Sequence, residues 1–246
     1  MHNTIYYEPL LVALSYVISV LGSYTALQLA IAIPQARDRL SALGWVLGAA
    51  VALGGGAIWS MHFIAMNAAD MGMPVSYDAS LTFASLLMAI AASGLGLYIV
   101  GRGEGSASKL LAAGVLTGLG VALMHYTGMA AMVMKATISY DSTLFYASLV
   151  IAVVAATVAL WLAFNLRGNL QRFGSAIIMG IAVCGMHYTG MYAVQMKHTS
   201  EPVAAAGLSL PPATMAHSVF VISAVVLVLL LGFNAWKAQR ALAADL

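Results

Sequence analysis

The chain has 246 residues, of which 62% are hydrophobic and 7% are charged, and its formal net charge is +2. Because a soluble domain carries roughly 25% charged residues, this composition excludes an ordinary soluble protein and predicts an integral membrane protein. The small net charge gives no indication of nucleic-acid binding, and the single cysteine, Cys184, excludes an intrachain disulfide.

Seven stretches without Asp, Glu, Lys or Arg follow one another along the chain, and each is at least 23 residues long. A helix needs about 20 apolar residues to cross a lipid bilayer. Backbone inside lipid is helical or forms a closed barrel, and the alternation of a strand is absent. The sequence therefore predicts an all-α integral membrane protein with seven transmembrane helices. The stretches cover 9–36, 40–69, 79–101, 110–134, 142–166, 173–196 and 202–236.

The loops between these stretches differ in their basic residues. One set of loops holds eight of the ten Lys and Arg residues, and the opposite set holds only Lys135 and Lys197. Cytoplasmic loops carry the excess of Lys and Arg. The N-terminus is therefore predicted to lie outside and the C-terminus inside. The eight residues are Arg37, Arg39, Arg102, Lys109, Arg167, Arg172, Lys237 and Arg240.

The predicted helices form a single domain, 1–246, built on an internal repeat. Three two-helix repeats are followed by a seventh helix. An acidic residue (Glu8, Asp78 or Asp141) stands just before the first helix of each repeat. Free N–H groups at a helix start favour a carboxylate, so we expect these residues to cap their helices. The alternative is that they support the ligands of a functional site at the same end of the helices. The repeats cover about 1–70, 71–135 and 136–197, and the last helix covers about 213–236.

The second helix of each repeat carries the motif Met-His-aromatic-x-x-Met near its outer end. Its histidines, His62, His125 and His187, are 63 and 62 residues apart. A polar side chain inside an apolar span is costly and usually marks a functional site. The methionine four residues after each histidine lies on the same helix face. The three copies occupy 61–66, 124–129 and 186–191.

Small residues recur at fixed distances from the histidines. Gly55, Gly118 and Gly180 each lie seven residues, or two helical turns, before a motif histidine. Small residues let membrane helices approach closely. We therefore expect the second helices of the repeats to face one another, with their histidines at a common depth. A further small residue follows each histidine by three positions, as Ala65, Gly128 and Gly190.

Imidazole and thioether together indicate a copper site, because thioether is a soft ligand that suits Cu(I). Mg and Ca prefer oxygen ligands, and zinc rarely takes thioether. Haem is disfavoured, since nothing in the spacing marks a haem cavity. The predicted copper ligands are His62, His125, His187, Met66, Met129 and Met191. Additional candidates are His217, Met61, Met124, Met186, Tyr126 and Tyr188.

The runs at 124–127 and 186–189 both read Met-His-Tyr-Thr, and here the chain resembles the MHYT domain family. The resemblance covers essentially the whole chain, although the first copy departs by having Phe63 and Ile64. It implies a sensor module of the bacterial inner membrane that binds copper through these His and Met residues and senses oxygen, carbon monoxide or nitric oxide. It also implies a cytoplasmic signalling domain or a separate signalling protein as partner.

Two other function classes remain open from the residues alone. One is a membrane metalloenzyme that performs copper-dependent oxidation or metal-dependent hydrolysis at the same histidines, with Tyr126 and Tyr188 as redox or proton donors. The other is copper transport or storage, although the inner halves of the second helices offer almost no ligands. Phosphate-binding loops, Ser-His-Asp sets and His-Glu-x-x-His motifs are absent from the sequence. We therefore favour a sensor or binding module over an enzyme.

Overall fold

The computed structural model describes residues 5–102, 106–166, 168–200 and 208–244. Within them, seven helical segments are long and apolar enough to cross a membrane, which confirms the predicted seven-span architecture. The helices are α1 (Pro9–Ala30), α2 (Ala32–Gln35), α3 (Arg39–Ala50), the π-helix η1 (Val51–Trp59), α4 (Ser60–Ala68), α5 (Ala79–Gly101), α6 (Ala107–Ala130), α7 (Ser142–Asn165), α8 (Asn169–Tyr192) and α9 (Pro212–Ala244).

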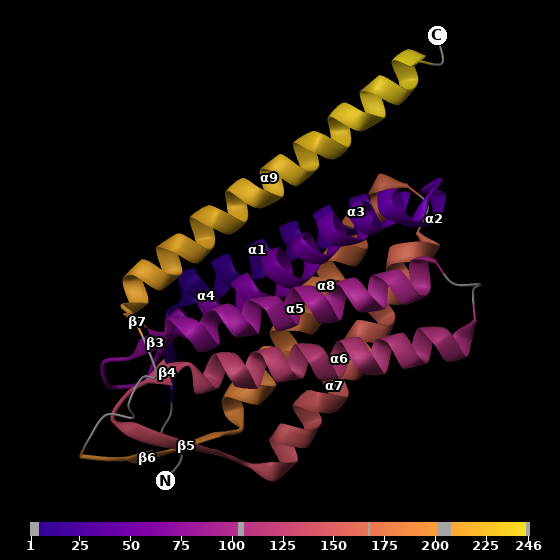
Figure 1. Ribbon diagram of the computed structural model, residues 1–246. Coiled ribbons are helices and arrows are strands. Elements are labelled where there is room, and N and C mark those ends of the chain that lie inside the picture. The colour runs from indigo at the N-terminus through magenta and orange to yellow at the C-terminus, as the bar shows by residue number, and fades with distance from the viewer. Residues whose placement is uncertain (1–4, 103–105, 167, 201–207, 245–246) are drawn as a thin grey trace.

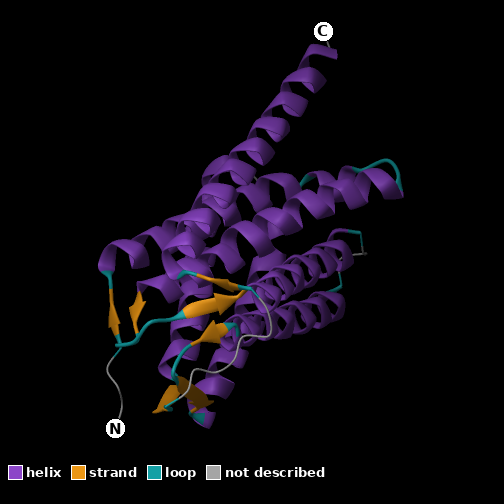
Figure 2. Ribbon diagram, turned by 60° about the vertical axis from the view of Figure 1, so that its left-hand side comes forward, coloured by secondary structure: helices purple, strands orange, loops and turns teal. Residues whose placement is uncertain are grey.

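Short strands, which the sequence analysis did not predict, gather at one end of the helical bundle (Figure 1, Figure 2). Antiparallel pairs join β1 to β2, β3 to β4 and β5 to β6, and β7 adds to the free edge of β3. Each repeat is therefore a strand, two membrane-spanning helical segments and a strand, and its two strands pair with each other. The strands are β1 (Tyr6–Tyr7), β2 (Ala69–Asp70), β3 (Ser76–Asp78), β4 (Met132–Val133), β5 (Ala136–Tyr140), β6 (Val194–His198) and β7 (Ser209–Leu210).

The three acidic residues cap the first helix of each repeat, as predicted. A carboxylate oxygen accepts a backbone N–H of the first turn at 2.7 Å for Glu8, 2.9 Å for Asp78 and 3.0 Å for Asp141. The backbone N–H of each capping residue also donates to a carbonyl at the end of the second helix of the same repeat, over 2.7–2.8 Å. One residue thus fixes both helices of its repeat at the end where the histidines lie.

The three repeats close into a ring. The motif-bearing helix of each repeat packs against the first helix of the next repeat, with η1 against α5, α6 against α7 and α8 against α1. The first and third repeats are therefore neighbours, although they are far apart in the sequence. Because the three motif-bearing spans run in the same direction, the ring brings the ends of α4, α6 and α8 together (Figure 1).

The seventh span, α9, lies outside this ring and against the first repeat (Figure 1). It contacts α1, α4 and η1, and the hydroxyls of Ser60 and Ser223 share a hydrogen bond. A Cβ on Gly56 would lie 2.8 Å from Leu227 Cδ2, so this glycine lets α9 approach closely. Gly56 belongs to the π-helix η1, a rare conformation that is frequent at functional sites.

Gly118 and Gly180 permit close helix packing, but not between the motif-bearing helices as the sequence suggested. A Cβ on Gly118 would lie 2.5 Å from Val153 Cα in α7, and one on Gly180 would lie 2.8 Å from Val20 in α1. Gly55 faces a side chain of α5 at an ordinary 3.5 Å. Two turns below the histidines, each glycine therefore meets the first helix of the next repeat, because those helices pack against the motif-bearing helices at that depth.

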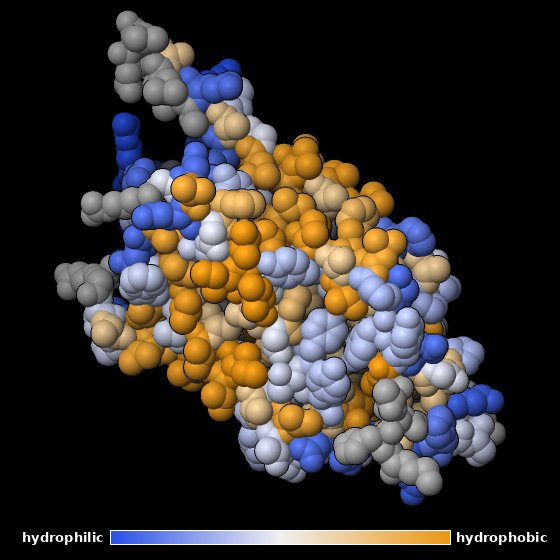
Figure 3. All heavy atoms as spheres, turned by 180° about the vertical axis from the view of Figure 1, so that it is seen from behind, coloured by the Kyte–Doolittle hydropathy of each residue, from blue (hydrophilic) through white to orange (hydrophobic). Residues whose placement is uncertain are grey.

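The surface of the bundle is that of a membrane-spanning domain. The face in Figure 3 carries a broad hydrophobic belt, and hydrophilic side chains gather toward two opposite ends. Large apolar side chains such as Leu87, Val150 and Val228 are more than half exposed on the helices. Lipid covers such side chains in a membrane, so their exposure here is expected.

Candidate metal centre

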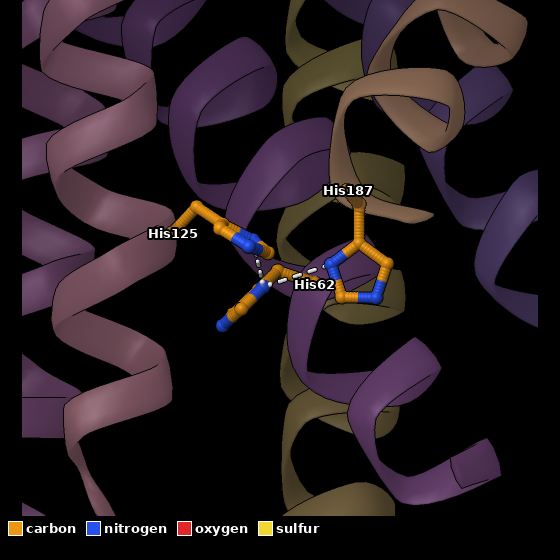
Figure 4. Close-up of side chains that lie close together, drawn as sticks. All are labelled: His62, His125 and His187. Carbon is orange, nitrogen blue, oxygen red and sulfur yellow. Dashed lines mark hydrogen bonds between the residues drawn. The ribbon is translucent and has the colours of Figure 1, made fainter. Parts of the chain in front are cut away.

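Three histidines from three helices meet inside the bundle (Figure 4). His62 lies on α4, His125 on α6 and His187 on α8, and each side chain is at most 1% exposed. The Nδ1 atom of His62 lies 3.0 Å from Nδ1 of His187 and 3.1 Å from Nδ1 of His125. One ligand atom from each of the three lies within 4.8 Å of the others. The repeated motif thus brings its three imidazoles into contact.

Two of the imidazoles pack on the glycine that follows the histidine of the next repeat. A Cβ on Gly128 would overlap Nε2 of His62, and a Cβ on Gly190 would overlap Nε2 of His125. These rings therefore lie directly on helix backbone, which glycine leaves uncovered. The sequence marked both glycines as small packing residues. Their contact with an imidazole depends on the cyclic arrangement of the repeats, which a local pattern does not reveal.

The nitrogens that point away from the centre of the cluster have no hydrogen-bond partner in the described part of the chain. The Nε2 atoms of all three histidines are buried and make no hydrogen bond with any residue that the structure describes. Three neutral imidazoles carry three N–H groups and three lone pairs. No placement of the three hydrogens satisfies all six nitrogens, and unsatisfied polar groups are costly in apolar surroundings.

A cation bound between the Nδ1 atoms would accept their lone pairs, so these nitrogens would no longer need hydrogen-bond partners at the centre of the cluster. Imidazole is a common ligand of transition metals. Ligand nitrogens about 2 Å from one ion lie about 3.5 Å apart when they surround it evenly in a plane. The observed separations of 3.0 and 3.1 Å are slightly shorter, so a small outward movement of the rings would admit an ion. The residues therefore fit a metal, although the usual hydrogen-bond partner on the second ring nitrogen is not found among the described residues.

The methionines of the motif are buried in the same hydrophobic cluster of the bundle. Those four residues after each histidine, Met66, Met129 and Met191, are at most 2% exposed. They lie one helical turn beyond the histidines on the same helix faces. The methionines directly before the histidines are equally enclosed, and they are Met61, Met124 and Met186.

His217, which the sequence suggested as an additional ligand, lies away from the cluster. It is exposed on α9, and its Nδ1 is 2.6 Å from the carbonyl oxygen of Ala213 on the same helix. The group of metal-ligating side chains found within the described residues contains only the three motif histidines. The reason is the position of α9, which packs outside the ring of repeats and presents Met215 rather than His217 to the core.

Aromatic side chains connect the repeats next to the histidines. Three pairs of rings do so. In each pair, a tyrosine from the first strand of one repeat packs edge-to-face on the aromatic residue of the motif in the preceding repeat. Burial raises the pKa of Tyr140 to about 12, and it also raises the pKa of Tyr7 and Tyr77, so these phenols stay neutral. The pairs are Tyr7 with Tyr188 (5.4 Å between ring centroids), Tyr77 with Phe63 (5.7 Å) and Tyr140 with Tyr126 (5.0 Å).

A buried serine on the first helix of each repeat was missed by the sequence analysis. Ser15, Ser85 and Ser148 each follow the capping acid by seven residues and are 0% exposed. The hydroxyls of Tyr126 and Ser148 are 2.7 Å apart. The motif of the first repeat has no tyrosine, and Trp59 Nε1 of that repeat donates a hydrogen bond to Ser85 of the second repeat at 3.0 Å instead. The constant offset from the acid is the signal that identifies these serines.

Comparison with known proteins matches residues 55–113 and 118–176 to the MHYT family, described as a bacterial signalling protein N-terminal repeat. The chain belongs to the MHYT family. Each matched segment begins at one of the packing glycines, seven residues before a motif histidine. The chain is therefore a signalling sensor module and a multi-pass protein of the bacterial inner membrane. No solved structure matches it.

The similar curated proteins are much longer than this chain. The bifunctional diguanylate cyclase/cyclic di-GMP phosphodiesterase MucR of Pseudomonas aeruginosa is 43% identical over 230 residues, which are 92% of the chain and 33% of MucR. The cyclic di-GMP phosphodiesterase NbdA of the same species is 38% identical over 78% of the chain and 25% of its own length. The signaling protein YkoW of Bacillus subtilis is 34% identical over 80% of the chain and 25% of its own length. The chain thus spans a third or less of each relative.

Proposed function

We propose that this sensor module binds copper through His62, His125 and His187 and detects a diatomic gas there. The observation that carries the proposal is the convergence of three buried Nδ1 atoms, two pairs of which are 3.0 and 3.1 Å apart. Keeping three imidazoles together in an apolar interior is costly without a cation between them. The C-terminal ends of α4, α6 and α8 also meet near the cluster, and their partial negative charge favours a bound cation.

Copper is favoured over other metals by the methionines beside the histidines. Met66, Met129 and Met191 supply thioether on the same helix faces and are almost fully buried. Thioether suits Cu(I), whereas the imidazoles bind either oxidation state of copper. Copper held in this way would supply redox chemistry and affinity for oxygen, carbon monoxide or nitric oxide.

The surroundings of the cluster favour detection of a gas over an enzymatic reaction. The imidazoles are at most 1% exposed, so the described residues leave no open route to them for a polar substrate or a bulky ion. Small uncharged gases dissolve in lipid and need no aqueous route. The metalloenzyme hypothesis requires such a route and is therefore the weaker alternative.

The proposed output is a change in a cytoplasmic signalling domain or protein. MucR and NbdA carry names that refer to the synthesis or hydrolysis of cyclic di-GMP. We propose that the module passes its signal to an output of this kind. The span α9, which packs on the first repeat and extends beyond the ring (Figure 1), is the element best placed to transmit a shift of α4.

The test is to purify the chain in lipid nanodiscs without chelators and to measure its metal content. Copper should copurify, and His125→Ala should lose most of it, because one imidazole of the trio is removed. The control is His217→Ala, which removes an exposed histidine outside the cluster and should keep its copper. Met129→Ala should weaken Cu(I) more than Cu(II) in competition with chelators specific for each oxidation state.

Spectra of the copper-loaded protein under oxygen, carbon monoxide and nitric oxide then test the sensor. At least one gas should change the spectrum, and His125→Ala should abolish the change. A wild-type protein that is fully folded and free of copper would refute the metal proposal. A copper protein whose spectrum ignores all three gases would refute the sensor proposal.

A further inference from the structure

A small cavity lies inside the ring of repeats, one helical turn below the three histidines. It has a volume of about 40 Å³ and is lined by side chains of η1, α6, α7 and α8. Ile58, Val121 and Val183 contribute to its wall, and each precedes a motif histidine by four residues. Residues four apart lie on the same face of a helix. The cavity is therefore on the side of the histidine cluster that faces the membrane interior.

The wall of this cavity is apolar. Thr117 is the polar residue of the lining, and its hydroxyl donates to the carbonyl oxygen of Ala92 at 3.2 Å, so it is already satisfied. A water molecule needs roughly 10–15 Å³ and two or more polar partners, and apolar cavities remain dry and accept apolar molecules. The cavity has the space for a small molecule but lacks the polar groups that would hold water.

One side of the cavity is formed by a helix that faces lipid. Four alanines of α7 line it, at positions 152, 155, 156 and 159. On the same helix, Val154 and Val158 are 56% and 43% exposed and point to the membrane. Alanine side chains of α7 therefore stand between the cavity and the bilayer, and Ala155 and Ala156 are partly exposed themselves.

We propose that this cavity binds a small uncharged apolar molecule that enters from the lipid past the alanines of α7, and that it supplies this molecule to the histidine cluster. The chemical class is that of a diatomic gas. The inference rests on the proposed function for its final step, the delivery to the histidines. The binding of an apolar molecule in the cavity does not depend on a metal.

Xenon is the probe, because it is apolar and occupies dry cavities in proteins. Methyl NMR of the full chain in nanodiscs should show xenon-dependent shifts for Ile58, Val121 and Val183. Ala156→Phe places a ring in the cavity and should abolish these shifts. The matched control is Val154→Phe, which adds the same ring to the lipid-facing side of α7 and should leave them unchanged. If Ala156→Phe does not fold, Ala155→Leu takes its place. It is a smaller change at the same wall, and it should weaken the xenon-dependent shifts.

Delivery is tested on the copper-loaded protein by the rate of carbon monoxide binding. Ala156→Phe should slow it by about tenfold or more relative to Val154→Phe, with unchanged copper content. Wild-type protein without xenon shifts at these methyls would overturn the cavity proposal, whatever metal is bound. Xenon binding in a protein that takes no copper would support the cavity and refute the proposed function. An unchanged carbon monoxide rate in a variant that has lost xenon binding would overturn delivery.

Discussion

The first repeat differs from the other two around its histidine, yet it presents that histidine to the same centre. The second and third motifs share Tyr, Thr and Gly after the histidine, whereas the first has Phe63, Ile64 and Ala65. The first repeat also contains the π-helix and is covered by α9. Despite these differences, Nδ1 of His62 lies within 3.1 Å of Nδ1 of both other histidines. The histidine position is therefore kept in all three repeats, although the residues that follow it differ.

The differences in the first repeat are matched by compensating contacts. Phe63 has no hydroxyl for the buried Ser85, and Trp59 donates its indole N–H to that serine instead. The glycines of η1 allow close approach of other helices, since a Cβ on Gly54 would overlap the carbonyl of Ala89 and one on Gly56 would meet α9. The first repeat is thus adapted to carry the seventh helix.

The largest effect is expected at the packing glycine of the second repeat. Gly118→Leu would force a side chain into the backbone of α7, because even a Cβ would lie 2.5 Å from Val153 Cα. Overpacking of this kind should destabilise the protein by about 3 kcal/mol or more, the upper part of the usual range. Gly55→Ala is a milder change at the corresponding position of the first repeat, where the Cβ has an ordinary contact at 3.5 Å, and it should be tolerated.

Unfolding in increasing amounts of denaturing detergent measures both variants in the same lipid mimic. The difference in stability between the two variants also shows which of these glycines is needed for close helix packing. Wild-type stability in Gly118→Leu would show that α6 and α7 do not pack as described. Equal destabilisation by Gly55→Ala would show that the first repeat is packed as tightly as the second.

The next effect concerns the glycines on which the imidazoles lie. Gly128→Ala places a Cβ over Nε2 of His62, so the ring must move and copper should be lost, with a cost of about 1–3 kcal/mol in stability. Ala65 is the counterpart in the first repeat and already carries a Cβ, so Ala65→Gly should retain copper. The control is Gly185→Ala on α8, where a Cβ meets nothing within 4 Å.

Copper content by mass spectrometry and thermal unfolding provide the measurement for these three variants. Retention of copper in Gly128→Ala at wild-type affinity would show that the ring of His62 does not lie on the glycine. Loss of copper in Gly185→Ala would show that any added methyl group on a motif helix disturbs the site.

The sequence was sufficient to predict the spans and the convergence of the three histidines, and it failed where contacts depend on the arrangement of the repeats. Uninterrupted apolar stretches mark spans because charge is costly in lipid. The glycines at 118 and 180 were recognised as packing residues, but their partner helices were wrong, since local spacing gives a face and not its neighbour. Strands of two to five residues are too short to leave a periodic pattern in the loops. The cavity below the histidines is formed by four helices together, η1, α6, α7 and α8, so no single segment of sequence reveals it.

The smallest effect is expected from the tyrosine hydroxyl that distinguishes the second motif from the first. Tyr126→Phe removes its hydrogen bond to Ser148, which should cost about 0.5–1.5 kcal/mol. The loss of stability should lie near the lower end of this range, because Ser148 still donates to the carbonyl oxygen of Phe145 at 2.7 Å. The reverse change, Phe63→Tyr, brings a hydroxyl toward Ser85, whose oxygen already accepts from Trp59, so little stability should be gained. Both variants should keep their copper, as measured together with detergent unfolding. Loss of copper in Tyr126→Phe alone would give the tyrosine a direct role at the metal and would make the first repeat the exception in function as well as in structure.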